Sequence, residues 1–164
     1  MARLLTTQVF FREVFMKNFV VSDIHDHYDL LMEALDRSGF DINNEDHRLI
    51  VCGDAFYSGP QPGELFVFLS DLSRKGRLIF TYGNHDIELL NNLRAERFTR
   101  SANRKCAELI VKHLTQNVGL SDDELIAECE RLGFTRFLAK TPVWYYENED
   151  YVFTHGFIPI EKKA

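Results

Sequence analysis

The stretch LIFTYGNHD, residues 78–86, decides the fold of this chain. Its apolar first half is typical of a short buried strand, and its second half, GNHD, lies where that strand would end and a helix begin. Two similar junctions come earlier, VVSDIH at residues 20–25 and LIVCGD at residues 49–54. Apolar strands that end in Asp, His or Asn and lead into helices predict an open α/β sheet with its functional site at the strands' carboxyl ends.

Length and composition limit the class of protein. The chain has 164 residues, of which 45% are hydrophobic and 27% charged, as expected for one soluble domain. We expect residues 16–164 to form this domain and residues 1–15 to be an N-terminal extension. The net charge of −6 argues against a nucleic-acid-binding surface, which needs clustered Lys and Arg. The three cysteines form no C-x-x-C pair, so we expect reduced thiols and a cytoplasmic protein.

The hydrophobic pattern predicts alternating strands and helices. The expected strands are residues 18–22, 48–52 and 77–82. The expected helices are residues 28–38, a segment after the Pro- and Gly-rich stretch 59–63, and a segment that begins within or after GNHD. This order predicts a parallel sheet with helical crossovers. No apolar run reaches the roughly 20 residues that a membrane span needs, so we expect no membrane partner.

The chain changes character after residue 100. Residues 100–132 are typical of two helices, and Ser121 with Glu124 predicts a capping box at the start of the second. We expect these helices to pack against the core, with a cap over the site as the alternative. Residues 143–146 and 151–154 predict an antiparallel hairpin that ends at His155.

Polar side chains follow the predicted strands. They are Asp23 and His25 after the first strand, Asp54 after the second, Asn84 and His85 after the third, and His155 at the end of the hairpin. Each motif alone is common in loops, but four in this order predict a metal centre. Oxygen and imidazole ligands without thiolate suit Mn, Fe, Zn or Mg. Asp54 has two carboxylate oxygens and could bridge two cations.

With these motifs in order, D-x-H, G-D, G-N-H-D and a later H-G, the chain resembles the calcineurin-like metallophosphoesterases. It is most similar to their phosphoprotein phosphatase branch, which includes bacterial and phage phosphatases and diadenosine tetraphosphatases. The run GFDINNEDHRLIVCGDAFYSGP, residues 39–60, carries this similarity. The resemblance covers roughly residues 19–158 and implies a layered α/β sheet with flanking helices.

The resemblance also implies two divalent metal ions, with Mn²⁺ the first expectation. It implies these ligands: Asp23 and His25 for the first ion, Asp54 for both, and Asn84 and His155 for the second. His85 would be the general acid that protonates the leaving oxygen, and Asp86 would at most support the ligands. A hydroxide held between the two ions would attack phosphorus.

The implied function is hydrolysis of a phosphate monoester, as in protein phosphatases, with a phosphorylated small molecule or a phosphoprotein as substrate. One alternative is hydrolysis of a dinucleotide polyphosphate or a phosphodiester. The other is a catalytically impaired metal-binding scaffold that acts through partners.

The chain departs from the family pattern at several places. The family's first motif has Gly on both sides, where this chain has Ser22 and Asp26, and we expect both to be tolerated. In the family's G-D-x-x-D-R-G, the second Asp partners the catalytic histidine and the Arg grips phosphate, but Tyr57 and Ser58 stand there in this chain. The family carries a further ligand histidine, and none follows His155. We therefore expect a shortened form in which the rest of a second sheet is missing, with an exposed apolar edge prone to self-association. The alternative is that the second metal is weakly held. We expect His27 and His47 in loops or turns and His113 on a helix, without ligand roles.

Overall fold

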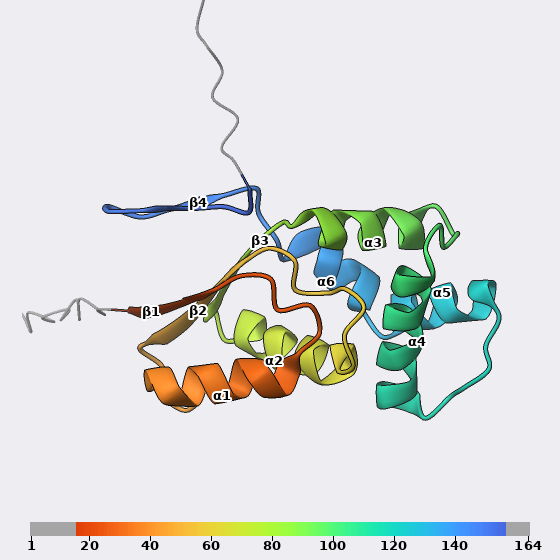
Figure 1. Cartoon of the computed structure of the whole chain (residues 1–164), viewed down its shortest axis with the longest axis horizontal. Coiled ribbons are helices and arrows are strands. Elements are labelled where there is room, and N and C mark those ends of the chain that lie inside the picture. The colour runs from red at the N-terminus through yellow and green to blue at the C-terminus, as the bar shows by residue number, and fades with distance from the viewer. Residues whose placement is uncertain (1–15, 157–164) are drawn as a thin grey trace, which may run out of the picture.

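A three-stranded parallel sheet lies at the centre of the fold (Figure 1). The structure, a computed structural model, describes residues 16–156, so the expected extension 1–15 lies outside the described residues. The strands are β1 (Lys17–Val21), β2 (His47–Cys52) and β3 (Leu78–Thr81), in the spatial order β1-β2-β3. Each begins and ends within one residue of its predicted bounds, and the predicted α/β class is confirmed.

The register of the sheet brings the three strand ends together. Val21 pairs with Val51, and Cys52 pairs with Thr81, so all three carboxyl ends lie at the same edge. The central strand is buried on both faces, with Ile50 and Val51 fully inaccessible, as a continuous apolar run predicts. The loops after the strands are therefore neighbours, although they are about 30 residues apart in the sequence.

Helices flank the sheet and extend the molecule to one side (Figure 1). Those of residues 16–156 are α1 (Tyr28–Ser38), α2 (Pro62–Arg74), α3 (Asn84–Arg94), α4 (Ser101–Thr115), α5 (Asp122–Arg131) and α6 (Phe134–Lys140). α1 has its predicted bounds, and α3 begins inside GNHD. The predicted capping box is present, with Ser121 N–H donating to Glu124 Oε2 at 2.8 Å. The seven-residue helix α6, which follows Gly133, was not predicted from the sequence.

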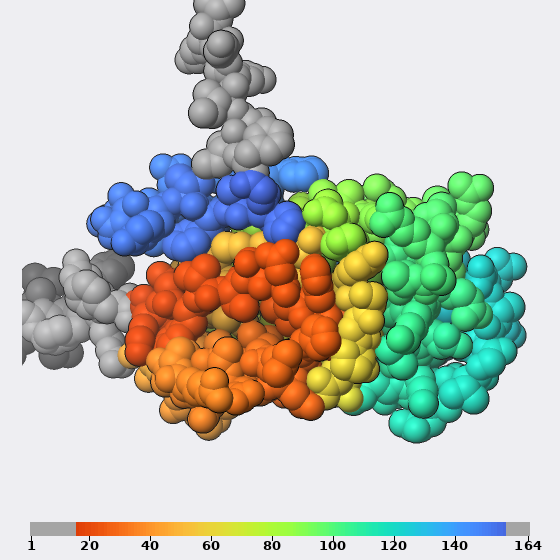
Figure 2. Space-filling view, in the orientation of Figure 1, coloured from red at the N-terminus to blue at the C-terminus, as the bar shows by residue number. Residues whose placement is uncertain are grey.

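The predicted hairpin is present but shorter than expected. Its strands are β4 (Tyr146–Glu147) and β5 (Val152–Phe153), which pair antiparallel and form a separate sheet. Val143 does not belong to it, because its N–H donates to Phe80 and its carbonyl accepts from Tyr82, which extends the edge of β3. Figure 2 shows the hairpin as a blue ridge beside the red segment that contains β1. Its end at His155 lies over the carboxyl edge of the main sheet.

The core joins the sheet to the helices. α4 and α5 contribute Ile110 and Leu125, both almost fully buried, so these helices pack as expected. Phe56, from the loop after β2, is fully buried, and its ring meets Phe134 of α6 edge-on with centroids 5.2 Å apart. Phe56 thus anchors a site loop in the core. Within residues 16–156, no helix combines the length and apolarity needed to cross a membrane.

Phe56→Ala should lower the free energy of unfolding by about 3–5 kcal/mol, because a fully buried ring leaves a cavity between the loop and α6. Urea unfolding followed by circular dichroism measures the change. Leu30→Ala is the control, since Leu30 is 60% exposed on α1 and its loss should cost less than about 1 kcal/mol. Equal effects of the two substitutions would contradict the anchoring role of Phe56.

Candidate metal centre

The loops after β1 and β2 continue side by side beyond the strands. Asp23 N–H donates to the carbonyl of Gly53 at 3.2 Å, and His25 N–H donates to the carbonyl of Asp54 at 3.1 Å. The D-x-H motif is thereby held directly against the G-D motif. The parallel pairing of the strands, extended by these two bonds, explains why the motifs meet.

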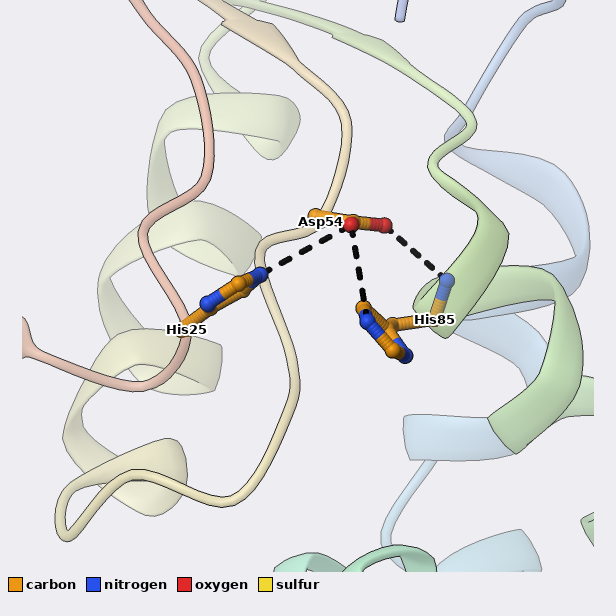
Figure 3. A group of neighbouring side chains, drawn as sticks. All are labelled: His25, Asp54 and His85. Atoms are coloured by element: carbon orange, nitrogen blue, oxygen red, sulfur yellow. Dashed lines mark hydrogen bonds and ion pairs between the residues drawn. The ribbon is translucent and has the colours of Figure 1, made fainter. Parts of the chain in front are cut away.

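The carboxylate of Asp54 lies at the centre of the site. Its Oδ2 is 3.4 Å from His155 Nε2, 3.6 Å from His25 Nε2 and 3.9 Å from His85 Nε2. Figure 3 shows His25, from the loop after β1, and His85, from the first turn of α3, approaching Asp54 from different sides. The other oxygen, Oδ1, accepts the backbone N–H of His85 at 2.9 Å, which ties Asp54 to the first turn of α3. Three imidazoles from three segments therefore surround one buried carboxylate.

Two sets of candidate ligands share Asp54. In one, its carboxylate lies with His25 and His85, and in the other with Asp23 and His155; within each set the ligand atoms lie within 4.8 Å of one another. The resemblance implies a different grouping, with Asp23 beside His25 on one ion and His85 not a ligand. Asn84 also reaches the site, with its Oδ1 3.3 Å from His155 Nε2. All six residues singled out from the sequence are gathered in one place.

The donor set fits a divalent cation. His25 Nε2 and His85 Nδ1 are buried, and neither has a hydrogen-bond partner within residues 16–156. His155 Nδ1 lies 3.0 Å from the carbonyl oxygen of Cys52, so a neutral ring donates there and turns its Nε2 lone pair toward the oxygens of Asp54 and Asn84. Lone pairs that converge in this way repel one another, and a bound cation would remove that repulsion.

The backbone of the site is strained. Asp23, His25 and Asp54 have φ of 53°, 47° and 51°, a left-handed conformation that residues other than glycine rarely adopt. Such conformations persist only where the surroundings impose them, and they cluster at functional sites. Two buried carboxylates supply the contacts that hold these loops.

The first is Asp86, the last residue of GNHD. Its Oδ2 accepts the N–H groups of Asp54 at 2.8 Å and Gly83 at 3.0 Å, and its Oδ1 accepts those of Ala55 and Phe56, both at 3.1 Å. Burial raises the pKa of Asp86 to about 6, and these hydrogen bonds limit the rise because they favour the charged form. Asp86 thus fastens the G-D loop to the start of α3.

The second is Asp26, a departure from the family pattern to which the sequence assigned no role. Asp26 is fully buried, and its Oδ2 accepts the N–H of Gly59 at 3.2 Å. Burial raises its pKa to about 8. A Cβ on Gly59 would lie 2.0 Å from the carbonyl oxygen of His25, so the loop after Asp54 passes directly against the D-x-H turn. The one sequence signal was an acid where the family pattern has glycine.

Tyr57, one of the two positions that depart from the family's G-D-x-x-D-R-G pattern, lies against His85. The Tyr57 ring stacks on the His85 ring, with centroids 3.6 Å apart and planes inclined by 16°. Ser58 is exposed with φ 54° and supplies no positive charge where the pattern has Arg.

The remaining histidines have other partners. His47 is the first residue of β2, so its expected place in a loop or turn is wrong, and its Nδ1 accepts the N–H of Asp41 at 2.9 Å. His113 lies on α4 with Nδ1 3.4 Å from Glu64 Oε1. His27 is exposed at the start of α1.

The parallel sheet, with acidic and histidine side chains gathered at the carboxyl ends of its strands, is the arrangement that the resemblance leads us to expect. The model of the calcineurin-like phosphoesterase family matches residues 16–162, so the chain belongs to this family, and the resemblance found from the motifs is confirmed.

Particular relatives are tetraphosphatases. The symmetrical bis(5'-nucleosyl)-tetraphosphatase of Buchnera aphidicola subsp. Baizongia pistaciae is 32% identical over 75 residues, which are 46% of this chain and 26% of that protein. The asymmetrical bis(5'-nucleosyl)-tetraphosphatase PrpE of Bacillus velezensis is 28% identical over 81 residues, 46% of this chain and 32% of that protein. The alignments thus span less than a third of these relatives. A crystal structure provisionally described as a diadenosine tetraphosphatase is 22% identical, with a TM-score of 0.42, over 70% of this chain and 43% of that one.

Asp86→Asn should lower the free energy of unfolding by about 2–5 kcal/mol, because the amide nitrogen would face backbone N–H groups that now meet an oxygen. Thermal and urea unfolding of the purified variant measure the loss. Asp150→Asn removes an exposed carboxylate of the hairpin loop and should change stability by less than about 0.5 kcal/mol. A fully stable Asp86→Asn variant would show that the four hydrogen bonds do not hold the loops.

Proposed function

We propose that this chain hydrolyses dinucleoside polyphosphates with the help of divalent metal ions. The observation that carries the proposal is the convergence of three imidazoles on the buried carboxylate of Asp54. Family membership supports phosphate-ester hydrolysis as the reaction class. The tetraphosphatase relatives support a dinucleotide substrate, which was the alternative in the sequence analysis and now replaces the phosphate monoester as the main hypothesis.

The proposed ligands of the ions are Asp23, His25, Asp54, Asn84 and His155, with Asp54 shared by both ions and Mn²⁺ the first candidate. The unpartnered His25 Nε2 and the orientation of the His155 ring support the assignment. Divalent ions bound there would supply positive charge to phosphoryl oxygens as negative charge develops on them. Neutral His25 and His155 would each keep one nitrogen available to a cation.

The proposed general acid is His85. Its ring is partly buried between Tyr57 and the carboxylate of Asp54, and its backbone N–H is held by Asp54 Oδ1. A protonated imidazole at this place can donate its proton to the oxygen that leaves phosphorus. His85 also lies within ligand distance of the set around His25, and the metal content of a His85 variant separates the two roles.

The substitution at position 58 favours an internal phosphate over a terminal one. A terminal phosphate monoester carries about two negative charges on one phosphorus, which Arg neutralises with paired hydrogen bonds. Ser58 cannot do so. A phosphate inside a polyphosphate chain carries one charge, so its recognition depends less on that side chain.

A substrate panel tests the proposal. We expect diadenosine tetraphosphate, with Mn²⁺, Mg²⁺ or Zn²⁺, to be hydrolysed with a kcat/KM at least about tenfold above that of p-nitrophenyl phosphate, because no Arg stands at position 58 to bind a dianion. Chromatography identifies the nucleotide products, and bis-p-nitrophenyl phosphate tests simple diesters. A preference for the aryl monoester would restore the protein-phosphatase hypothesis. If the protein binds metal but hydrolyses none of these compounds, the result would favour the alternative of a catalytically impaired metal-binding scaffold.

Asp54→Asn should remove most of the bound metal, since the shared carboxylate loses its charge and one of its oxygens. Metal analysis after dialysis against Mn²⁺ or Zn²⁺ measures the stoichiometry. His113→Ala is the matched control, because His113 lies on α4 outside both ligand sets. Unchanged metal content in Asp54→Asn would exclude Asp54 as the bridging ligand.

His85→Ala should lower kcat by about 100-fold or more and leave the metal content intact, as expected for a general acid that is not a ligand. Steady-state kinetics and metal analysis on the same preparation measure both quantities. Loss of metal together with activity would make His85 a ligand, as its proximity to His25 and Asp54 permits.

A further inference from the structure

An aromatic ring covers one face of the proposed general acid. The Tyr57 and His85 rings are nearly parallel, and their 3.6 Å centroid separation is the shortest between aromatic rings in residues 16–156. His25 meets both rings edge-on, with centroids 5.7 Å from Tyr57 and 5.6 Å from His85. Tyr57, His25 and His85 therefore form one ring cluster at the site.

His85 lacks the hydrogen bond that commonly orients a catalytic imidazole. Its Nδ1 is buried and has no hydrogen-bond partner among residues 16–156. A hydrogen bond at that atom would fix the ring plane, and without one the torsion between Cβ and the ring is broad. The stacked phenol limits this torsion instead, because rotation out of the parallel plane drives the imidazole edge into Tyr57.

The loop that carries Tyr57 is itself held in place. The buried Asp26 carboxylate interacts with the backbone N–H of Tyr57 and accepts the N–H of Gly59. Gly59 N–H also lies 2.8 Å from the carbonyl oxygen of Tyr57, and Ser58 between them has φ 54°. On the other side, Phe56 is buried in the core. Tyr57 therefore extends from a turn whose backbone is held on both sides, so its ring has a fixed position next to His85.

We propose that Tyr57 is a positioning residue, whose flat ring holds the His85 imidazole in place by stacking. The proposal rests on the proposed function for its effect on catalysis, but the stacking can be measured without activity. Since the face of the ring makes the contact, the hydroxyl group is dispensable and the aromatic ring is required.

Kinetics test the catalytic effect. Tyr57→Phe keeps the ring and should retain kcat within about twofold, whereas Tyr57→Leu should lower kcat by about 10- to 100-fold with little change in KM, because a misoriented acid affects the chemical step. In a His85→Ala background, Tyr57→Leu should have almost no further effect, since Tyr57 acts through His85. Tyr28→Leu, at a partly buried tyrosine of α1, is the control and should leave kcat unchanged.

Nuclear magnetic resonance tests the stacking independently of activity. The ring protons of His85, assigned by their loss in His85→Ala, should be shifted upfield by the Tyr57 ring in the protein with Zn²⁺ or Mg²⁺. Tyr57→Leu should abolish this shift, and Tyr57→Phe should keep it. If Tyr57→Leu does not fold, Tyr57→Met replaces it as an apolar side chain without a ring.

Three results would overturn the proposal. They are an equal loss of kcat in Tyr57→Phe and Tyr57→Leu, a full effect of Tyr57→Leu in the His85→Ala background, and His85 resonances that do not respond to loss of the Tyr57 ring. If the unmodified protein hydrolyses nothing, the proposed function fails, while the resonance shift still decides whether Tyr57 positions His85.

Discussion

The buried carboxylate of Asp86 and the four backbone N–H groups that it accepts hold the two halves of the site together. Without this acceptor, the N–H groups of Asp54 and Gly83 would be buried without partners, each at a cost of about 1–3 kcal/mol. The same bonds keep Asp54 in its strained conformation, with φ 51°. Asp86 therefore fixes the backbone of Asp54, and the backbone N–H of His85 holds the Asp54 carboxylate on which the imidazoles converge.

Much of the fold was predictable because it follows from local pattern. The bounds of α1 follow from apolar residues at helical spacing, and the three strands are continuous apolar runs. The features that were not predicted are either contacts between distant parts of the chain or very short elements. Val143 joins the edge of β3, which shortens the hairpin, and this pairing depends on tertiary register. The seven-residue α6 follows Gly133, whose φ of 82° is typical of a residue that ends a helix. In the sequence this glycine therefore indicates the end of α5 and gives no sign that another helix begins.

The sequence predicted which residues form the site better than it predicted how they are arranged. Strand ends and the resemblance named the residues that meet around Asp54, but which ring approaches which oxygen depends on the positive φ at Asp23 and His25, for which non-glycine residues give no sequence signal. The roles of Asp26 and Tyr57 were missed for a related reason. The burial of Asp26 and the stacking of Tyr57 depend on how the loop after β2 folds back on the D-x-H turn. The local sequence predicts neither.

The close approach of Gly59 to His25 limits how the site can be altered. Because the contact is between two backbones, a methyl group at position 59 would collide with the carbonyl oxygen of His25 at 2.0 Å, and rotation of a side chain cannot relieve it. A library that randomises this loop to change substrate preference would need to keep residue 59 constant. Position 58 is exposed and only one residue away, and it is where the family pattern has Arg, so it is the place to restore a phosphate-binding cation.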